Sequence, residues 1–461
     1  MRLLGSVHDR AQEQAIERAA ARLSRGLKDD PRRSLSLALR SAIALAPGRG
    51  EQQLASHAYD YLVKAFASDL RPMPAQSLCR AIDAVSEDCI ERLVSNVALW
   101  IARGSGRRLQ AQQELGASPL VILISPSMRC NMKCKGCYAA EYDHSDGLSI
   151  DIIDRVITEA SALGTFAVTL LGGEPLLRAD VLDLVERHRE MTFQIFTNGT
   201  LIDSRVAERL AAAGNVLVSV SIDGARAQHD KRRGDGSLEL VERGMARLRA
   251  QGVPFGFSTM ITSQNCEYVI ADAFVDYLIG QGCLWGWHFM YMPVGDSPDL
   301  RLMPTPEQRE YLRTQGAARI RSRKPIFVID FWNDAPYVGG CIAAGREYLH
   351  INSRGDVEPC IFTHFSVDNV REKCLSDVLR SPYFEGIRAR QPYDSNLLRP
   401  CMLIDNTHVV REVVGSTGAR PTHPEAELLL TTLAPGLDAY AAEYKQIADV
   451  AWSASPAPSV H

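Results

Sequence analysis

Three cysteines stand close together in the segment CNMKCKGCY, as Cys130, Cys134 and Cys137. Thiolates on a short loop can hold three corners of a cubic iron–sulfur cluster, and the fourth iron then stays open for a reactant. A structural zinc site needs four closed ligands, and this segment offers no fourth cysteine or histidine at finger spacing; His144 is the nearest histidine. Structural zinc and cysteines that are merely buried together remain the alternative interpretations.

A second group of cysteines lies much later in the chain. Cys341 and Cys360 bound the segment CIAAGREYLHINSRGDVEPC, with the spacing C-x13-G-x4-C, and the segment LLRPC supplies Cys401. The stretch REYLHINSRGDVEPC predicts a β-hairpin whose turn lies at SRGD. A hairpin whose cysteines simply pack in the core is the alternative.

The elements that must position these cysteines follow from the hydrophobic pattern. Residues 1–116 predict helices only, because apolar residues recur at three- and four-residue steps. Beyond Pro119, helical stretches alternate with short apolar runs, which predicts a parallel sheet covered by helices. We expect strands at 120–125, 166–171, 193–196, 216–222, 255–261 and 287–292. Periodicity alone leaves a doubly wound sheet and a partial barrel open, but in both the site forms at the carboxyl ends of the strands.

The cysteine loop follows the first expected strand, and an aromatic residue, Tyr138, follows its last cysteine. This C-x3-C-x2-C motif in a β-α array closely resembles the radical S-adenosylmethionine (SAM) enzymes, over about residues 118–295. The resemblance implies an α/β fold with a partial (β/α)6 TIM-like barrel. It also implies a [4Fe–4S] cluster on Cys130, Cys134 and Cys137, which binds SAM at its open iron. Reductive cleavage of SAM then gives a 5′-deoxyadenosyl radical that abstracts hydrogen from a substrate.

The turn GGEP agrees with this resemblance, since it follows the second expected strand. It comprises Gly172, Gly173, Glu174 and Pro175. Glycines allow the backbone to approach a ligand closely, and an acceptor-rich turn suits an ammonium group. The resemblance implies that this turn binds the amino group of SAM; taken alone, GGEP could be an ordinary turn.

Other polar residues end the third and fourth strands. The resemblance implies that Asn198 in TNG and Ser221 in SIDG contact SAM, that Arg233 in HDKRRG meets the SAM carboxylate, and that Tyr138 lies near the adenine. Asn-Gly and Asp-Gly are also common turn dipeptides, so Asp223, which the resemblance makes a further candidate for a SAM contact, could instead cap its own turn. A basic surface loop is the alternative for Arg233, and the aromatic segment WGWHFMYMPVG could frame the substrate.

The later cysteines resemble the SPASM and twitch extensions of radical SAM enzymes, which hold auxiliary [4Fe–4S] clusters. A full SPASM extension continues with a block C-x2-C-x5-C-x3-C, which this chain lacks. We therefore expect one auxiliary [4Fe–4S] cluster on Cys341, Cys360 and Cys401. Cys374, His364, another residue or the substrate could supply the fourth ligand.

Four regions are expected along the chain. They are a helical domain at 1–116, the radical SAM core at 117–300, a small α+β iron–sulfur extension at 301–415 and a helical tail at 416–461. The net charge of −4 over 461 residues does not favour nucleic-acid binding by bulk charge. The absence of a long apolar run and of a signal-peptide pattern, together with the clustered cysteines, predicts a cytoplasmic protein without a transmembrane segment.

These observations predict a radical SAM enzyme with an unidentified substrate and an external electron donor such as flavodoxin or ferredoxin. A small or lipid-like substrate is favoured over a peptide or protein, because the amino-terminal helices do not resemble a winged-helix peptide-recognition domain. The alternative is a non-catalytic iron–sulfur redox sensor or metal-binding protein, which would not need the GGEP turn.

Overall fold

A computed structural model describes residues 18–19, 21–30, 34, 73–139 and 147–454 of the chain. Most of the expected amino-terminal helical domain, and His144, lie outside these residues. The part of that domain that is described is helical: α4 (Met73–Ala84), α5 (Glu87–Leu99) and α6 (Ser105–Leu115) follow one another. Within the described ranges, no helix is both long and apolar enough to cross a membrane.

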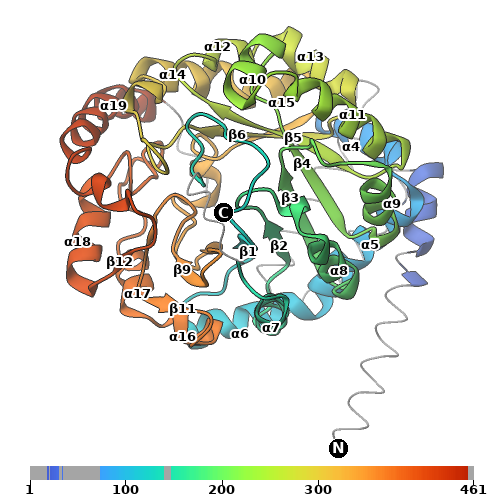
Figure 1. Cartoon of the computed structure of the whole chain (residues 1–461), viewed down its shortest axis with the longest axis horizontal. Helices are drawn as coiled ribbons and strands as arrows, with labels where there is room; N and C mark the ends of the chain where they lie inside the picture. Colours follow the sequence, from blue (N-terminus) through green and yellow to red (C-terminus); the bar gives the residue numbers. More distant parts are fainter. Residues whose placement is uncertain (1–17, 20, 31–33, 35–72, 140–146, 455–461) are drawn as a thin grey trace, which may run out of the picture.

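One large sheet organises the molecule. Its ten strands run in the order β11-β9-β8-β1-β2-β3-β4-β5-β6-β7. The expected six strands form its middle and pair in parallel with their neighbours in the sequence: β1 (Val121–Ile124), β2 (Ala167–Leu170), β3 (Thr192–Thr197), β4 (Val216–Ser221), β5 (Phe255–Ile261) and β6 (Trp285–Met290). In Figure 1 the strands surround the centre of the molecule and the helices form an outer ring. This arrangement is the partial barrel and excludes the doubly wound alternative, in which helices would cover both faces.

The helices between successive strands cover the outer face of the sheet. They are α7 (Ile150–Ala162), α8 (Ala179–Arg187), α9 (Ser204–Ala213), α10 (Arg226–Arg233), α11 (Ser237–Ala250), α12 (Cys266–Val269) and α13 (Asp272–Gln281). Helix α9 shows how the sequence sets these elements: Asp203 accepts a hydrogen bond from the backbone of Val206 at its start, and Gly214 ends it in a left-handed conformation. Alternate residues of β1, such as Ile122 and Ile124, are fully buried against the helices. The other residues of the strand face the barrel interior.

The sixth strand begins and ends two residues earlier than predicted. Gly286 lies inside it because the ring of Phe257 packs there: an added Cβ would lie 2.1 Å from the Phe257 Cζ atom. The chain leaves the ladder around Pro293, which has no N–H to donate to a neighbouring strand, and Val294 closes a turn onto the carbonyl of Met292.

The carboxyl-terminal extension shares the barrel sheet. After η3 (Leu300–Leu302), α14 (Pro306–Gln315) and α15 (Ala317–Arg323), strand β7 (Phe327–Asp330) pairs in parallel with β6. Strand β8 (Tyr348–Ile351) pairs in parallel with β1, and β9 (Asp356–Glu358) folds back on β8. The predicted hairpin is thus confirmed, with Gly355 of its turn at a φ of 89°. Because the sheet continues past residue 300, the expected core and extension are structurally joined; the domain boundaries stay a prediction.

Short elements complete the extension. They are η4 (Ala335–Val338), β10 (Phe365–Ser366), β11 (Asp368–Asn369), α16 (Leu375–Leu379), α17 (Pro382–Arg388), α18 (Thr407–Thr417), β12 (Arg420–Pro421), η5 (Ala426–Leu429) and α19 (Ala434–Ala454). A buried ion pair joins distant parts of this carboxyl-terminal region: Arg309 on α14 contacts Asp405 at 2.7 Å and lies over the ring of Tyr444 on α19. Asp405 also accepts a hydrogen bond from the backbone of Cys401, so this ion pair positions that cysteine.

Candidate active site

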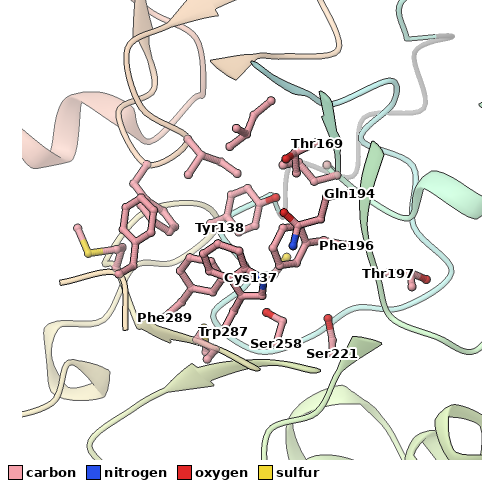
Figure 2. Close-up of a pocket in the computed structure, with 18 of the residues that line it drawn as sticks. Cys137, Tyr138, Thr169, Gln194, Phe196, Thr197, Ser221, Ser258, Trp287 and Phe289 are labelled. Atoms are coloured by element: carbon pink, nitrogen blue, oxygen red, sulfur yellow. The ribbon is translucent and has the colours of Figure 1, made fainter. Parts of the chain in front are cut away.

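A pocket of about 580 Å³ lies inside the curve of the sheet. Figure 2 shows its labelled side chains converging from the cysteine loop and from the barrel strands. Cys130, Cys134 and Cys137 all line this pocket, as do Gly172 and Gly173 of the GGEP turn. The structure therefore brings the first cysteine group and the turn after β2 to one cavity.

The three cysteines are half-buried and unpaired. Burial, together with the nearby Glu174, Cys134 and Cys137, raises the pKa of Cys130 to about 11. Burial also raises the pKa of Cys137, while Arg232 opposes that rise. Thiolates crowded in this way are favoured only when cationic metal compensates their charge.

The donor arrangement distinguishes a cluster from a single metal ion. Among the residues that the structure describes, no three His, Cys, Asp or Glu side chains lie close enough to hold one ion. The three thiols of the loop nevertheless influence each other electrostatically. A four-iron cluster is larger than one ion, so its thiolates stand further apart, and the loop fits a cluster better than the zinc alternative.

The GGEP turn packs directly on the cysteine loop. A Cβ added to Gly173 would lie 2.1 Å from the carbonyl oxygen of Arg129, and one added to Gly172 would lie 2.7 Å from that of Ser127. Glu174 donates its backbone N–H to the Arg129 carbonyl at 2.9 Å. Only glycine leaves room for this approach, so the turn and the loop form one unit.

The carboxylate of Glu174 is buried at the centre of this unit. It accepts hydrogen bonds from the backbone of Leu176, from the hydroxyl of Thr197 and from the backbone of Asn198. Burial raises its pKa, but all three partners are donors and favour the ionised carboxylate. In this structure Glu174 supports the turn, which begins the short helix η2 at Pro175. Its contact with the amino group of SAM stays a prediction.

The expected strand-end residues reach the same pocket. Asn198, Ser221 and Arg233 all line it. The side-chain amide of Asn198 lies 3.9 Å from the sulfur of Cys130, and the Arg233 guanidinium lies 3.9 Å from that of Cys134. Arg233 is therefore not part of an exposed basic loop.

Asp223 pairs with two arginines, an arrangement that neither a turn cap nor a contact with SAM describes. Its carboxylate pairs with Arg232 at 2.5 Å and with Arg233 at 2.6 Å. Burial alone would raise the pKa of Asp223, but the two guanidinium groups hold it well below its usual range. Asp223 thus orients Arg233 toward the cysteine loop, and Arg232 is a site residue that the sequence motif did not single out.

The structure also brings the cysteines of the second group, Cys341, Cys360 and Cys401, near one another. Burial raises the pKa of each of Cys341, Cys360 and Cys401, to about 12 for Cys360. The neighbouring Cys341 thiol also raises the pKa of Cys360, and both Cys341 and Cys360 raise that of Cys401. The hydroxyl of Tyr348 donates a hydrogen bond to the sulfur of Cys360 at 2.9 Å. As with the first group, this spread of thiols suits a cluster rather than one ion.

Cys374 and His364, the two named candidates for the fourth ligand of the auxiliary cluster, contact other groups in the structure. Cys374 is the N-cap residue directly before α16, and its thiol lies 3.1 Å from both Ser376 Oγ and Asp377 Oδ2. The ring of His364 lies 3.1 Å from the carbonyl of Ile361. Neither contact indicates that Cys374 or His364 acts as a ligand together with Cys341, Cys360 and Cys401, and the identity of the fourth ligand stays open.

The pocket has a polar side and an aromatic side. Thr169 and Gln194 are neighbours on β2 and β3, and Ser221 and Ser258 are neighbours on β4 and β5. The aromatic side is a group of rings that also line the pocket, most of them in contact with one another: Phe196, Trp287, Phe289, Phe331, Tyr348 and Phe362. The expectation that inward residues of WGWHFMYMPVG frame the cavity agrees with this lining. The polar side was missed, although the alternation within β2 and β3 indicates which residues point inward.

Charge is scarce in the described lining. It contains only three charged side chains, those of Arg232, Arg233 and Glu347. The two arginines pair with Asp223, and Glu347 pairs with Arg108 at 2.6 Å. A group bound against the aromatic side therefore meets mostly apolar atoms.

Comparisons with known proteins agree with this geometry. The family described as the radical SAM superfamily matches residues 124–273, and an iron–sulfur cluster-binding domain called SPASM matches residues 341–402. The Fe-coproporphyrin III synthase of Methanosarcina barkeri is 28% identical over 59% of this chain and 77% of its own. The PqqA peptide cyclase of Granulibacter bethesdensis is 25% identical over 63% of this chain and 81% of its own. The crystal structure of Streptococcus suis SuiB bound to S-adenosylmethionine has a TM-score of 0.55, with 20% identity over 71% of this chain and 87% of that one.

These matches favour an enzyme over the redox-sensor alternative, because the relatives modify substrates. The first matched family implies a [4Fe–4S] cluster and SAM, and the SPASM domain implies auxiliary iron–sulfur clusters. The first matched segment contains the first cysteine group, and the second matched segment contains the second group. The chain belongs to the radical SAM superfamily, among the members that carry a SPASM extension.

Proposed function

We propose that Cys130, Cys134 and Cys137 hold the SAM-binding cluster and that Cys341, Cys360 and Cys401 hold one auxiliary cluster. The observation that carries this proposal is the shared pocket. The first group lines it, and Tyr348, which contacts Cys360, lines the same cavity. A substrate in the pocket would therefore lie between the two cysteine groups.

The residues around the first group suit the binding of SAM. When bound, the cluster and SAM together supply the 5′-deoxyadenosyl radical that abstracts hydrogen from the substrate. The backbone of Gly172 and Gly173 is open to the pocket and can accept the ammonium group. Ser221 presents its hydroxyl to the cavity, and Arg233 is oriented by Asp223 toward the same region. Tyr138, packed edge-on against Phe362, closes the wall beside the last cysteine of the loop.

The walls of the pocket also indicate the substrate. The charged side chains of the described lining lie at two places: Arg232 and Arg233 share the carboxylate of Asp223 beside the cysteine loop, and Glu347 pairs with Arg108. Away from the cysteine loop, an added carboxylate or phosphate would therefore find no cation in this lining. Aromatic rings from β6 and the extension exclude water, which would protect a radical from side reactions. We infer that the substrate places an uncharged, apolar group in the pocket, and that a small or lipid-like molecule fits it best.

An external one-electron donor, such as flavodoxin or ferredoxin, completes the proposal. The eleven cysteines all lie in described ranges and none is in a disulfide, which agrees with a reducing cytoplasmic location.

Modification of a peptide is the second candidate for the function of this protein, and the peptide cyclase among the relatives is the observation that favours it.

The test is to incubate reconstituted, dithionite-reduced protein with SAM and with separate fractions of a cell extract, and to measure 5′-deoxyadenosine. We expect an apolar, solvent-extracted fraction to raise its formation above the level without added fraction. Stimulation by the peptide fraction alone would replace the small-molecule proposal with the peptide candidate. If no fraction stimulates and no basal 5′-deoxyadenosine forms, the proposed site is wrong.

A further inference from the structure

Tyr348 occupies the boundary between the pocket and the second cysteine group. It is the first residue of β8, where it pairs in register with Val121 of β1. Both residues line the pocket, and Tyr348 is only 5% exposed. Its ring lies edge-on to that of Phe331, with the centroids 6.0 Å apart, and Phe331 in turn contacts Phe289. The ring of Tyr348 is therefore part of the aromatic side of the pocket.

The hydroxyl of the same residue points away from that ring contact to the second cysteine group. It donates a hydrogen bond to the sulfur of Cys360 at 2.9 Å. The thiols of Cys341 and Cys401 also raise the pKa of this phenol electrostatically, so the phenol lies in the neighbourhood of the second cysteine group. One side chain thus contributes its ring to the pocket and its hydroxyl to the auxiliary site.

We propose that Tyr348 is a positioning residue that couples the pocket to the auxiliary cluster, by donating a hydrogen bond to the Cys360 thiolate that makes this cluster easier to reduce. The inference rests on the proposed function, in which Cys341, Cys360 and Cys401 hold the cluster. Reduction adds one negative charge to a cluster, and a hydrogen bond to a ligating sulfur stabilises that charge. A substrate that moves the Tyr348 ring would change this hydrogen bond, and with it the reduction potential.

A neighbouring tyrosine provides a matched control. Tyr383 on α17 is completely buried, and its phenol is also close enough to Cys360 for an electrostatic effect on its pKa. Its hydroxyl has no hydrogen-bond partner within the described part of the chain. Tyr383→Phe therefore removes the same atom beside the same cysteine without removing a hydrogen bond to sulfur.

The experiment compares the reconstituted wild-type protein with Tyr348→Phe and Tyr383→Phe. Iron content and electron paramagnetic resonance first establish that each protein holds two clusters. A redox titration then follows the two reduced-cluster signals separately. We expect Tyr348→Phe to move the auxiliary signal to a more negative potential and to leave the SAM-cluster signal in place, whereas Tyr383→Phe moves neither.

Deuterium exchange gives a readout that simple packing would not change. In D2O, electron–nuclear double resonance of the reduced auxiliary cluster should show an exchangeable deuteron that disappears in Tyr348→Phe and remains in Tyr383→Phe. Equal potentials and equal deuteron couplings in all three proteins would overturn the role of Tyr348. Loss of the auxiliary cluster in Tyr348→Phe would also count against it, because a tuning role predicts normal loading. A wild-type protein with only one cluster would instead refute the proposed function on which this inference rests.

Discussion

The carboxylate of Glu174 accepts a hydrogen bond from the backbone N–H of Asn198 at 2.7 Å. This bond joins the turn after β2 to the end of β3, and the Asn198 side chain in turn approaches Cys130. The arrangement therefore links two strand ends and the cysteine loop through one buried acid. The shape of the proposed SAM-binding region therefore depends on Glu174 even without direct contact between its carboxylate and SAM.

Replacing Glu174 with glutamine should disturb this linkage. The glutamine NH2 group would face one of three donors, from Leu176, Thr197 or Asn198, and leave it unsatisfied. We expect the free energy of unfolding to fall by about 1–3 kcal/mol and the KM for SAM to rise. Denaturant unfolding and 5′-deoxyadenosine kinetics measure both. Glu239→Gln, at an exposed position on α11, is the control, and an equal response of both variants would contradict the prediction.

The contact between the GGEP turn and the cysteine loop makes a second prediction. Gly173→Ala would place a methyl group 2.1 Å from the Arg129 carbonyl and push the loop away. We expect this variant to lose the SAM-binding cluster while it keeps the auxiliary one, as measured by iron content and paramagnetic resonance. Gly280→Ala on α13 meets no atom within 4 Å and serves as the control. Normal loading of the Gly173 variant would show that the turn does not constrain the loop.

The second cysteine group predicts different effects for two cysteines of the extension. Cys401→Ala should lose about four irons, because its thiol belongs to the proposed auxiliary site. Cys374→Ala should lose none, because that thiol contacts Ser376 and Asp377 at the start of α16. Iron and sulfide analysis of both variants checks this. Equal loss from the two would make Cys374 the fourth ligand.

His288 on β6 should make stability depend on pH. The histidine is 1% exposed, and burial lowers its pKa to about 4 from an ordinary value of 6.5. The unfolded chain therefore binds more protons below pH 6.5, and stability falls as the pH falls from 6.5 toward 4. This group alone accounts for about 2 kcal/mol between pH 7 and pH 5.

His288→Leu should reduce that dependence, since neither ring nitrogen has a hydrogen-bond partner in the described structure. Urea unfolding of the metal-free protein at pH 5 and pH 7 measures the difference. His408→Leu, at an exposed position on α18, should keep the wild-type dependence. An unchanged pH dependence in the His288 variant would mean that His288 is protonated in the fold.

The first cysteine group and the barrel could be predicted from the sequence because their signals are local. Cys130, Cys134 and Cys137 lie within eight positions, and each strand forms one short apolar run. The GGEP turn could be placed because it follows β2 directly. The hairpin at β8 and β9 was predictable for the same reason, since its turn and both strands lie within eleven residues.

Long-range pairing explains what the sequence did not predict. Nothing in the pattern around Tyr348 indicates that β8 pairs with β1, more than 220 residues earlier. Without that pairing, Tyr348 could not be assigned to the pocket or to Cys360. The ion pairs of Asp223 could not be predicted, because its partners, Arg232 and Arg233, come from the following helix, and their burial depends on the folded barrel.

The most direct test of the account replaces Cys130, Cys134 and Cys137 together with alanine. The reconstituted variant should keep about four irons, held by the second cysteine group, and should form no 5′-deoxyadenosine from SAM after reduction with dithionite. The wild-type protein should hold about eight irons and form it. Continued formation of 5′-deoxyadenosine by the triple variant, or loss of all its iron, would contradict the proposal of two separate cysteine sites around one pocket.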